Sequence, residues 1–209
     1  MQEIFLEAES LKNKGGWVVD SGSMETLHSA YLMAHGMGIP VADAFDSIEI
    51  ACDGEYSVWA LTRDWTATWN IADPAGKFEI LLDGKPLSHT LGTNGKAWSW
   101  QLAGQQHLAK GIHTLSLHDL TGFNGRCDAI YLTDSGEIPP SDAKSLDEMR
   151  RRLNWKKDIG WWHLKDGSRA NNSHQPCDST QSEIEKFRYC VERLGIEHKY
   201  PMPEKWGQK

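Results

Sequence analysis

The 209-residue sequence predicts an all-β fold, a jelly-roll β-sandwich that is followed by a short C-terminal helical tail. Short runs of β-branched and aromatic residues recur along residues 1–137, with no helical segment between them. Four Asp-Gly or Asn-Gly pairs, which favour the positive φ angles of tight turns, separate these runs. The hydrophobic fraction of 39% and the charged fraction of 24% are ordinary for a globular protein.

The strands are expected over residues 5–9, 17–20, 47–52, 56–62, 78–82, 98–102, 112–118 and 129–133. The turn pairs between them are Asp53-Gly54, Asp83-Gly84, Asn94-Gly95 and Asn124-Gly125. Apolar side chains fall on both faces of segment 56–62, as in an inner strand, whereas Leu115 and Leu117 share one face of segment 112–118. Many short strands without helices between them are typical of two sheets around one core.

The composition changes at Pro139-Pro140, which separates a predicted sandwich domain over residues 1–137 from a tail over residues 138–209. The first part is acidic and the second is basic. The tail has too few apolar residues for a core of its own, so we expect it to pack on the sandwich.

Two capping boxes predict two helices in the tail. Ser145 is the expected N-cap of the first helix, Glu148 reaches back to it, and the helix continues through Leu153. The second box begins at Thr180, and apolar residues spaced by three and four extend that helix to Gly195.

Charge and hydropathy exclude several partners. The net charge is −7 and the pI is about 5.7, which argues against nucleic acid. No apolar run approaches the length of a membrane span, so no membrane association is expected. Residues 1–10 lack the basic and apolar regions of a secretory signal.

The opening Phe5-Leu6-Glu7-Ala8-Glu9-Ser10, the following Gly15-Gly16-Trp17 and the late Cys127-Asp128-Ala129-Ile130-Tyr131-Leu132 resemble segments of carbohydrate-binding modules of families 6 and 35. The resemblance implies a β-sandwich and a structural calcium ion (Ca²⁺) with Glu7, Glu9 and Asp128 as ligands, and calcium favours such clustered oxygen ligands. The alternative is that Glu7 and Glu9 are solvated charges of an edge strand.

A second resemblance covers about residues 4–153. Its motifs are Gly16-Trp17-Val18-Val19-Asp20, Ala34-His35-Gly36, Thr62-Arg63-Asp64-Trp65, the segment 118–128 and Met149-Arg150-Arg151-Arg152-Leu153. They look like an accessory module of large bacterial FAD-dependent oxidoreductase or xanthan-lyase-like proteins. This chain has no Gly-x-Gly-x-x-Gly loop, so no flavin is expected in it.

The two resemblances imply a non-catalytic module that binds a polysaccharide, with an acidic glycan as one candidate. Aromatic faces stack on pyranose rings, and arginine can bind a uronate carboxylate. The candidate ligand-binding residues are Arg63, Asp64, Trp65, Trp69, Trp98 and Trp100. The alternative is that tryptophans fill the core, which we favour for Trp17, for Trp59 and for one or both of Trp98 and Trp100.

A rival interpretation is a small polysaccharide lyase or glycosidase. His118 and Asp119, with Arg126 and with His35 if the fold brings it near, offer a base, an orienting carboxylate and a cationic stabiliser. The alternative is a buried polar network that ties a loop to the sandwich, and we favour binding over catalysis. A third interpretation is a purely structural accessory domain.

Polysaccharide-binding modules work outside the cytoplasm, so the resemblance implies a secreted or periplasmic location. It also implies a larger multidomain protein or an enzyme as partner.

Overall fold

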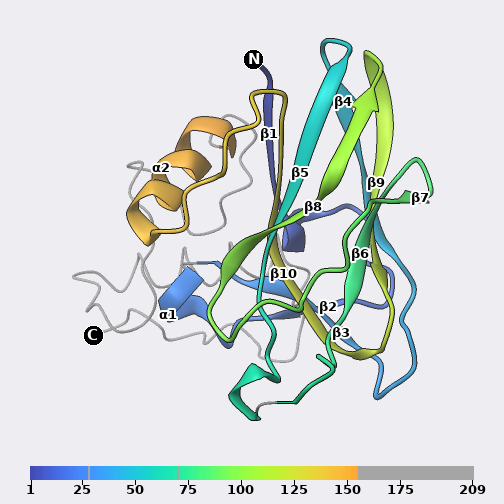
Figure 1. The fold of residues 1–209 in the computed structure, drawn as a ribbon, viewed down its shortest axis with the longest axis vertical. Coiled ribbons are helices and arrows are strands. Elements are labelled where there is room, and N and C mark those ends of the chain that lie inside the picture. Colours follow the sequence, from blue (N-terminus) through green and yellow to red (C-terminus); the bar gives the residue numbers. More distant parts are fainter. Residues whose placement is uncertain (28, 70, 155–209) are drawn as a thin grey trace, which may run out of the picture.

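The computed structural model describes residues 1–27, 29–69 and 71–154, which form a two-layer β-sandwich with two helices on one side (Figure 1). The strands are β1 (Glu3–Glu7), β2 (Val18–Asp20), β3 (Tyr31–His35), β4 (Ala44–Ile50), β5 (Gly54–Thr62), β6 (Phe78–Leu82), β7 (Lys85–Pro86), β8 (Ser99–Leu108), β9 (Gly111–Asp119) and β10 (Phe123–Thr133). The α-helices are α1 (Met24–Leu27) and α2 (Ala143–Asn154), and the 3-10 helices are η1 (Ala8–Ser10) and η2 (Ala67–Trp69).

The strands form two antiparallel sheets. The first has the order β2-β3-β10-β5-β8, with β1 also paired to β10, and the second has the order β4-β9-β6-β7. Strand β10 changes its partner along its length, because residues 123–127 pair with β3 and residues 129–133 pair with β1. This architecture confirms the predicted all-β jelly-roll sandwich.

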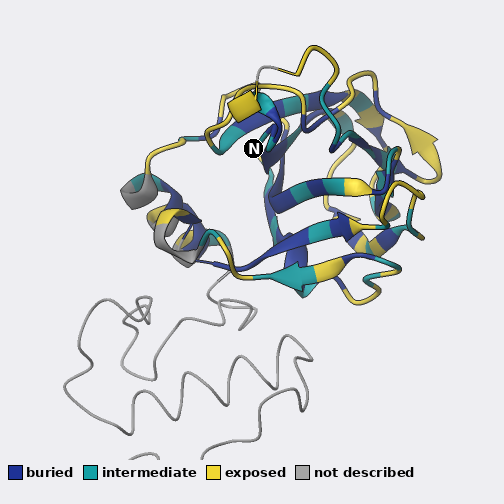
Figure 2. Cartoon of the chain, turned by 90° about the horizontal axis from the view of Figure 1, so that it is seen from below, coloured by how far each residue is buried: buried dark blue, intermediate teal, exposed yellow. Residues whose placement is uncertain are grey.

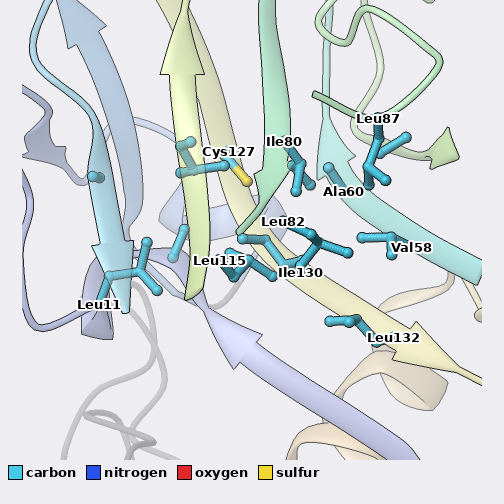
Figure 3. Packing of buried hydrophobic residues seen from close by; sticks show 14 of the residues in the cluster. Leu11, Val58, Ala60, Ile80, Leu82, Leu87, Leu115, Cys127, Ile130 and Leu132 are labelled. Carbon is cyan, nitrogen blue, oxygen red and sulfur yellow. The ribbon is translucent and has the colours of Figure 1, made fainter. Parts of the chain in front are cut away.

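The main core lies between the two sheets, and it follows from the alternation of buried and exposed residues along each strand. In β6 every second residue is buried, and in β4 the buried residues are Ala44, Ile48 and Ile50. Figure 3 shows Leu82, Leu115 and Ile130, from β6, β9 and β10, gathered in the space between the sheets. Figure 2 shows buried residues, in dark blue, along the strands of both sheets and exposed residues, in yellow, in many of the loops.

A second apolar cluster lies on the other face of the six-stranded sheet. Phe5, Trp100 and Tyr131 come from three of its strands, and Leu146 and Met149 come from α2, which packs beside β1 (Figure 1). The first part of the tail therefore packs on the sandwich. The predicted helix over residues 180–195 lies outside the described residues.

The structure corrects several local predictions. Strands β3 and β7 and helix α1 were not expected. Helix α2 begins at Ala143, earlier than predicted, and its N-cap is Asp142 rather than Ser145. The backbone N of Ser145 donates to Asp142 Oδ1 over 2.9 Å. Neither of the two described α-helices is long and apolar enough to cross a membrane.

The turn pairs behave in different ways. Asp83 and Gly84 have φ of 50° and 76° and connect β6 to β7 as a tight hairpin, as predicted. Asn124 also has a positive φ, of 60°, but it lies inside β10 at a register shift of its pairing with β3. Strand β10 begins at Phe123, earlier than predicted, so Phe123 and Arg126 lie on the strand.

Candidate functional site

An aromatic cluster lies at the end of the sandwich where the chain leaves β5. We call Trp65, Trp69 and Phe123 the aromatic end cluster. The Trp65 ring meets Trp69 edge-on at 5.6 Å between centroids, and it lies parallel to Phe123 at 6.3 Å and 3°. Trp69 is 62% exposed and Phe123 is 47% exposed. The cluster therefore presents flat apolar faces to solvent.

Hydrogen bonds hold Trp65 and the turn that carries it in place. Its Nε1 donates to the carbonyl of Phe123 over 2.8 Å. Asp64 is buried, and its Oδ1 accepts from the backbone N (2.8 Å) and the hydroxyl (2.6 Å) of Thr66, which shapes the turn before η2. A Cβ on Gly76 would lie 2.9 Å from the Trp65 ring, so a glycine there lets the indole approach the backbone. Asp64 thus supports the site rather than facing a ligand.

One arginine, Arg126, lies against the aromatic end cluster, and a second, Arg63, is near enough to Arg126 for their charges to interact. The guanidinium of Arg126 lies 5.4 Å from the Trp65 ring centroid and 5.9 Å from that of Tyr31. Burial lowers the pKa of Arg63, and the like charge of Arg126 lowers it further. Within the described residues, neither guanidinium forms an ion pair with a carboxylate. The pair therefore makes a positive spot beside the rings.

Trp98 and Trp100 lie on one face, as their spacing of two predicts, but in different surroundings. Trp98 is partly buried against Tyr31, with 5.0 Å between ring centroids. Trp100 is buried, packs on Phe5 and Tyr131, and donates from Nε1 to the Pro140 carbonyl over 2.9 Å. Trp100 therefore fixes the segment that leads into α2 and offers no free face to a ligand.

The residues of the catalytic alternative are not assembled. His118 pairs with Asp43, Nδ1 to Oδ1 at 2.9 Å. Asp119 is buried and accepts backbone N–H groups of Val41, Thr121 and Gly122, which is the structural role considered as its alternative.

The other two members of the catalytic alternative also have separate partners. His35 contacts Asn124, Nδ1 to Oδ1 at 2.6 Å, while Arg126 faces Tyr31 and Trp65. No hydrogen bond or ion pair among the described residues joins His118 to Asp119 or Arg126.

The carboxylates implied as calcium ligands do come together, but an arginine lies among them. Glu7, Glu9 and Asp128 are all buried. The Nε of Arg150 on α2 lies 2.7 Å from Glu7 Oε1, and its Nη2 lies 2.6 Å from Asp128 Oδ2. The described residues contain no group of three or more His, Cys, Asp or Glu side chains arranged to hold a metal ion. Calcium stays a prediction that these contacts do not favour.

The charges of this buried cluster influence one another. Burial raises the pKa of Glu9 well above its ordinary value, and the neighbouring Glu7 and Asp128 carboxylates raise it further. Burial alone would lower the pKa of Arg150, but the carboxylates of Glu7 and Asp128 outweigh that effect and raise it. Arg150 is therefore a permanent buried cation.

Sequence reasoning did not identify Arg150, although a signal was present. Leu146, Met149, Arg150 and Leu153 occupy positions i, i+3, i+4 and i+7 of one helix, the spacing of a face that packs on a core. An arginine on such a stripe is only 1% exposed here. A charged residue is seldom fully buried unless it is paired, so the position of Arg150 on this buried helix face predicts carboxylate partners inside the protein.

Comparisons with known proteins show what this architecture resembles. No protein-family model and no curated protein matches the chain. Among solved structures, a family 35 carbohydrate-binding module from Clostridium thermocellum aligns with a TM-score of 0.51 and 14% identity, over 65% of this chain and 100% of that one. A GH26-CBM35 β-(1,4)-mannanase from Podospora anserina aligns with a TM-score of 0.50 and 20% identity, over 66% of this chain.

The chain spans 29% of the length of that mannanase. A family 6 module of a laminarinase from Zobellia galactanivorans aligns less closely, with a TM-score of 0.46 and 16% identity, over 63% of this chain and 99% of that one. The first two alignments each cover about two thirds of this chain, whose strands form the two sheets described above. The chain therefore has the β-sandwich fold of carbohydrate-binding modules.

Proposed function

We propose that this chain is a non-catalytic glycan-binding module whose ligand lies across the aromatic end cluster. The observation that carries the proposal is that the rings of Trp69 and Phe123 are exposed to solvent while each packs against the ring of Trp65. Flat, solvent-facing aromatic rings suit the apolar faces of pyranose sugars. The fold likeness to carbohydrate-binding modules supports the same function.

We propose further that the glycan is acidic. Arg126 lies beside the Trp65 ring and its charge acts on Arg63, so a carboxylate between the two guanidinium groups would relieve their repulsion. A uronate that stacks on Trp69 and pairs with a guanidinium would use both features. Asp64 and Trp100 are left out of the proposed binding face because both are buried and hydrogen-bonded.

The remaining expectations belong to the same proposal. A module of this kind works within a larger multidomain protein or beside an enzyme, in a secreted or periplasmic location. The finer resemblance, to the accessory module of bacterial FAD-dependent oxidoreductase or xanthan-lyase-like proteins, stays a prediction. No observation favours the lyase alternative, since its four residues have separate partners.

Affinity gel electrophoresis tests the proposal. The full chain is run through gels that contain polygalacturonate, alginate, β-mannan or β-glucan. Retardation by a uronate polymer is expected, and Trp69→Ala should weaken it by at least about tenfold, because an exposed stacking ring of this size contributes on the order of 1.4 kcal/mol. Ile112→Ala is the matched control, since Ile112 is also exposed (69%) but lies on β9 in the other sheet.

The same gels separate the two parts of the proposal. Arg63→Gln and Arg126→Gln should reduce retardation by uronate polymers more than retardation by neutral ones. If no polymer retards the wild type, or if Trp69→Ala matches Ile112→Ala, glycan binding at this surface is refuted. A purely structural accessory role would then be the interpretation that remains.

A further inference from the structure

In the six-stranded sheet, β10 changes its pairing partner at a single residue, and we call this place the junction of β1, β3 and β10. Strand β10 pairs with β3 up to Cys127 and with β1 from Ala129 onward, so Asp128 lies where one partner ends and the other begins. The pairing of β10 with β5 also shifts register at this point. Asp128 is fully buried, and its Oδ1 accepts a hydrogen bond from the hydroxyl of Ser29 over 2.6 Å.

The guanidinium of Arg150 fills this junction. Besides its ion pairs with Glu7 and Asp128, its Nη1 donates to the Leu27 carbonyl over 2.6 Å and its Nη2 donates to the Ser29 hydroxyl over 2.7 Å. Its contacts reach the end of β1, Asp128 in the middle of β10, the last residue of α1 and the segment before β3. A planar guanidinium with five N–H donors is suited to join groups from several directions.

A calcium ion at this place would compete for the same oxygens. Calcium takes six to eight oxygen ligands at about 2.3–2.6 Å. Here, Glu7 Oε1 and Asp128 Oδ2 each face a guanidinium nitrogen at 2.7 Å and 2.6 Å. An ion bound between them would have to displace Arg150, which would leave a guanidinium without its carboxylates inside the protein. That displacement is strongly unfavourable, as for any buried charge that loses its partner.

We infer that Arg150 takes the place of a structural metal cation at the junction of β1, β3 and β10. The positive charge that holds Glu7 and Asp128 together is supplied by helix α2 itself. The fold is therefore stable without calcium, and α2 is part of the folding unit. This inference is independent of the proposed glycan binding, because the junction and the aromatic end cluster share no residue.

The first test measures the thermal midpoint Tm of the full wild-type chain in EDTA, in millimolar CaCl2 and in MgCl2 at equal ionic strength. The expected result is the same Tm in all three solutions. A Tm that falls in EDTA, or that rises in CaCl2 alone, would overturn the inference. This arm uses the unaltered chain, so it gives an answer even if a variant fails to fold.

The second test replaces the cation. Arg150→Gln should lower Tm by roughly 10 °C or more, because it leaves buried carboxylates without their cation. Arg152→Gln is the matched control, since Arg152 lies two residues further along α2, is 55% exposed and pairs with Glu3 at the surface. Arg150→Lys keeps the positive charge but lacks the planar guanidinium, so its Tm should lie between those of the wild type and Arg150→Gln.

The last arm asks whether the vacated position accepts a metal ion. With Arg150→Gln the carboxyl groups of Glu7, Glu9 and Asp128 remain close together without the guanidinium, so this variant is expected to gain several degrees of Tm in CaCl2. If Arg150→Gln has the Tm of Arg152→Gln, or if it folds and does not respond to calcium, the replacement of a metal cation is refuted.

Discussion

Strand β9 carries two aliphatic side chains of similar size in opposite environments. Leu115 is fully buried between the sheets, whereas Ile112 is 69% exposed on the same strand. Leu115→Ala should therefore lower the free energy of unfolding by about 3 kcal/mol, because it removes buried methyl groups and leaves a cavity. Ile112→Ala should cost less than about 0.5 kcal/mol. Urea denaturation of both variants measures the difference, and equal losses would contradict the assigned core.

His113 and Asp83 form a pair whose strength depends on pH. Both ring nitrogens of His113 face oxygens, Nδ1 to Asp83 Oδ2 and Nε2 to the Ala109 carbonyl, each at 2.7 Å. These acceptors favour the doubly protonated ring, so the hydrogen bond to Asp83 first, and that to Ala109 second, raise the pKa of His113 above 6.5. The hydrogen bond from His113 in turn lowers the pKa of Asp83 below 3.8.

The pair predicts a window of stabilisation. The stabilisation that comes from protonated His113 is fully present below pH 6.5 and is lost as pH rises through the raised pKa of His113. The stabilisation that comes from ionised Asp83 is fully present above pH 3.8 and is lost as pH falls through the lowered pKa of Asp83. His113→Gln should therefore cost most between these limits, by no more than about 1 kcal/mol because Asp83 is half exposed. Urea unfolding at pH 5.5 and 8.5 tests this, and a larger cost at pH 8.5 would refute it.

Individual residues differ in how far the sequence could place them. Trp17, which was predicted to lie in the core, is 3% exposed, and Trp69, which was predicted to face a ligand, is 62% exposed. The contact between Trp65 and Phe123 could not be predicted, since the two residues lie 58 positions apart in the sequence and only the fold brings them together. Arg150 was missed for a related reason, because the acceptors it needs come from distant segments.

At the scale of elements, patterns with strong local chemistry were predicted and weak ones were not. Strands rich in β-branched and aromatic residues, such as β5, were found. Strand β3 reads Tyr-Leu-Met-Ala-His, with no β-branched residue and three good helix formers, so tertiary pairing with β10 decides its structure. The start of α2 was misplaced because both Asp142 and Ser145 are good caps, and local sequence does not choose between them.

Asp142 caps the N-terminus of α2. Asp142→Ala should lower the free energy of unfolding by about 1 kcal/mol, because it removes the acceptor of the Ser145 amide. Ser145→Ala should change it little, since the serine is already inside the helix. Thermal unfolding of the two variants distinguishes them. A larger loss for Ser145→Ala would restore Ser145 as the cap.

At the scale of the whole molecule, α2 bears on where the folding unit ends. The boundary after residue 137 stays a prediction, but the cluster of Leu146 and Met149 with Phe5, Trp100 and Tyr131 favours an end after α2. A chain of residues 1–154 should unfold cooperatively. A chain of residues 1–137 should lose cooperative unfolding and near-ultraviolet circular dichroism, because it exposes this apolar cluster. If residues 1–137 retain the Tm of residues 1–154, α2 is dispensable for folding.

The central position of β10 has a consequence for how the chain is made. The last strand of the sandwich pairs with the first, and Gln2 N donates to Asp134 Oδ1 across 132 residues. While a ribosome synthesises the protein, β1, β3 and β5 must wait for β10 before their sheet can form, and their open edges remain available to neighbouring chains. Folding dominated by such distant contacts is slow and exposes the nascent chain to aggregation. We therefore expect slower translation or chaperone binding before residue 154 to affect the yield of this protein more than its final stability.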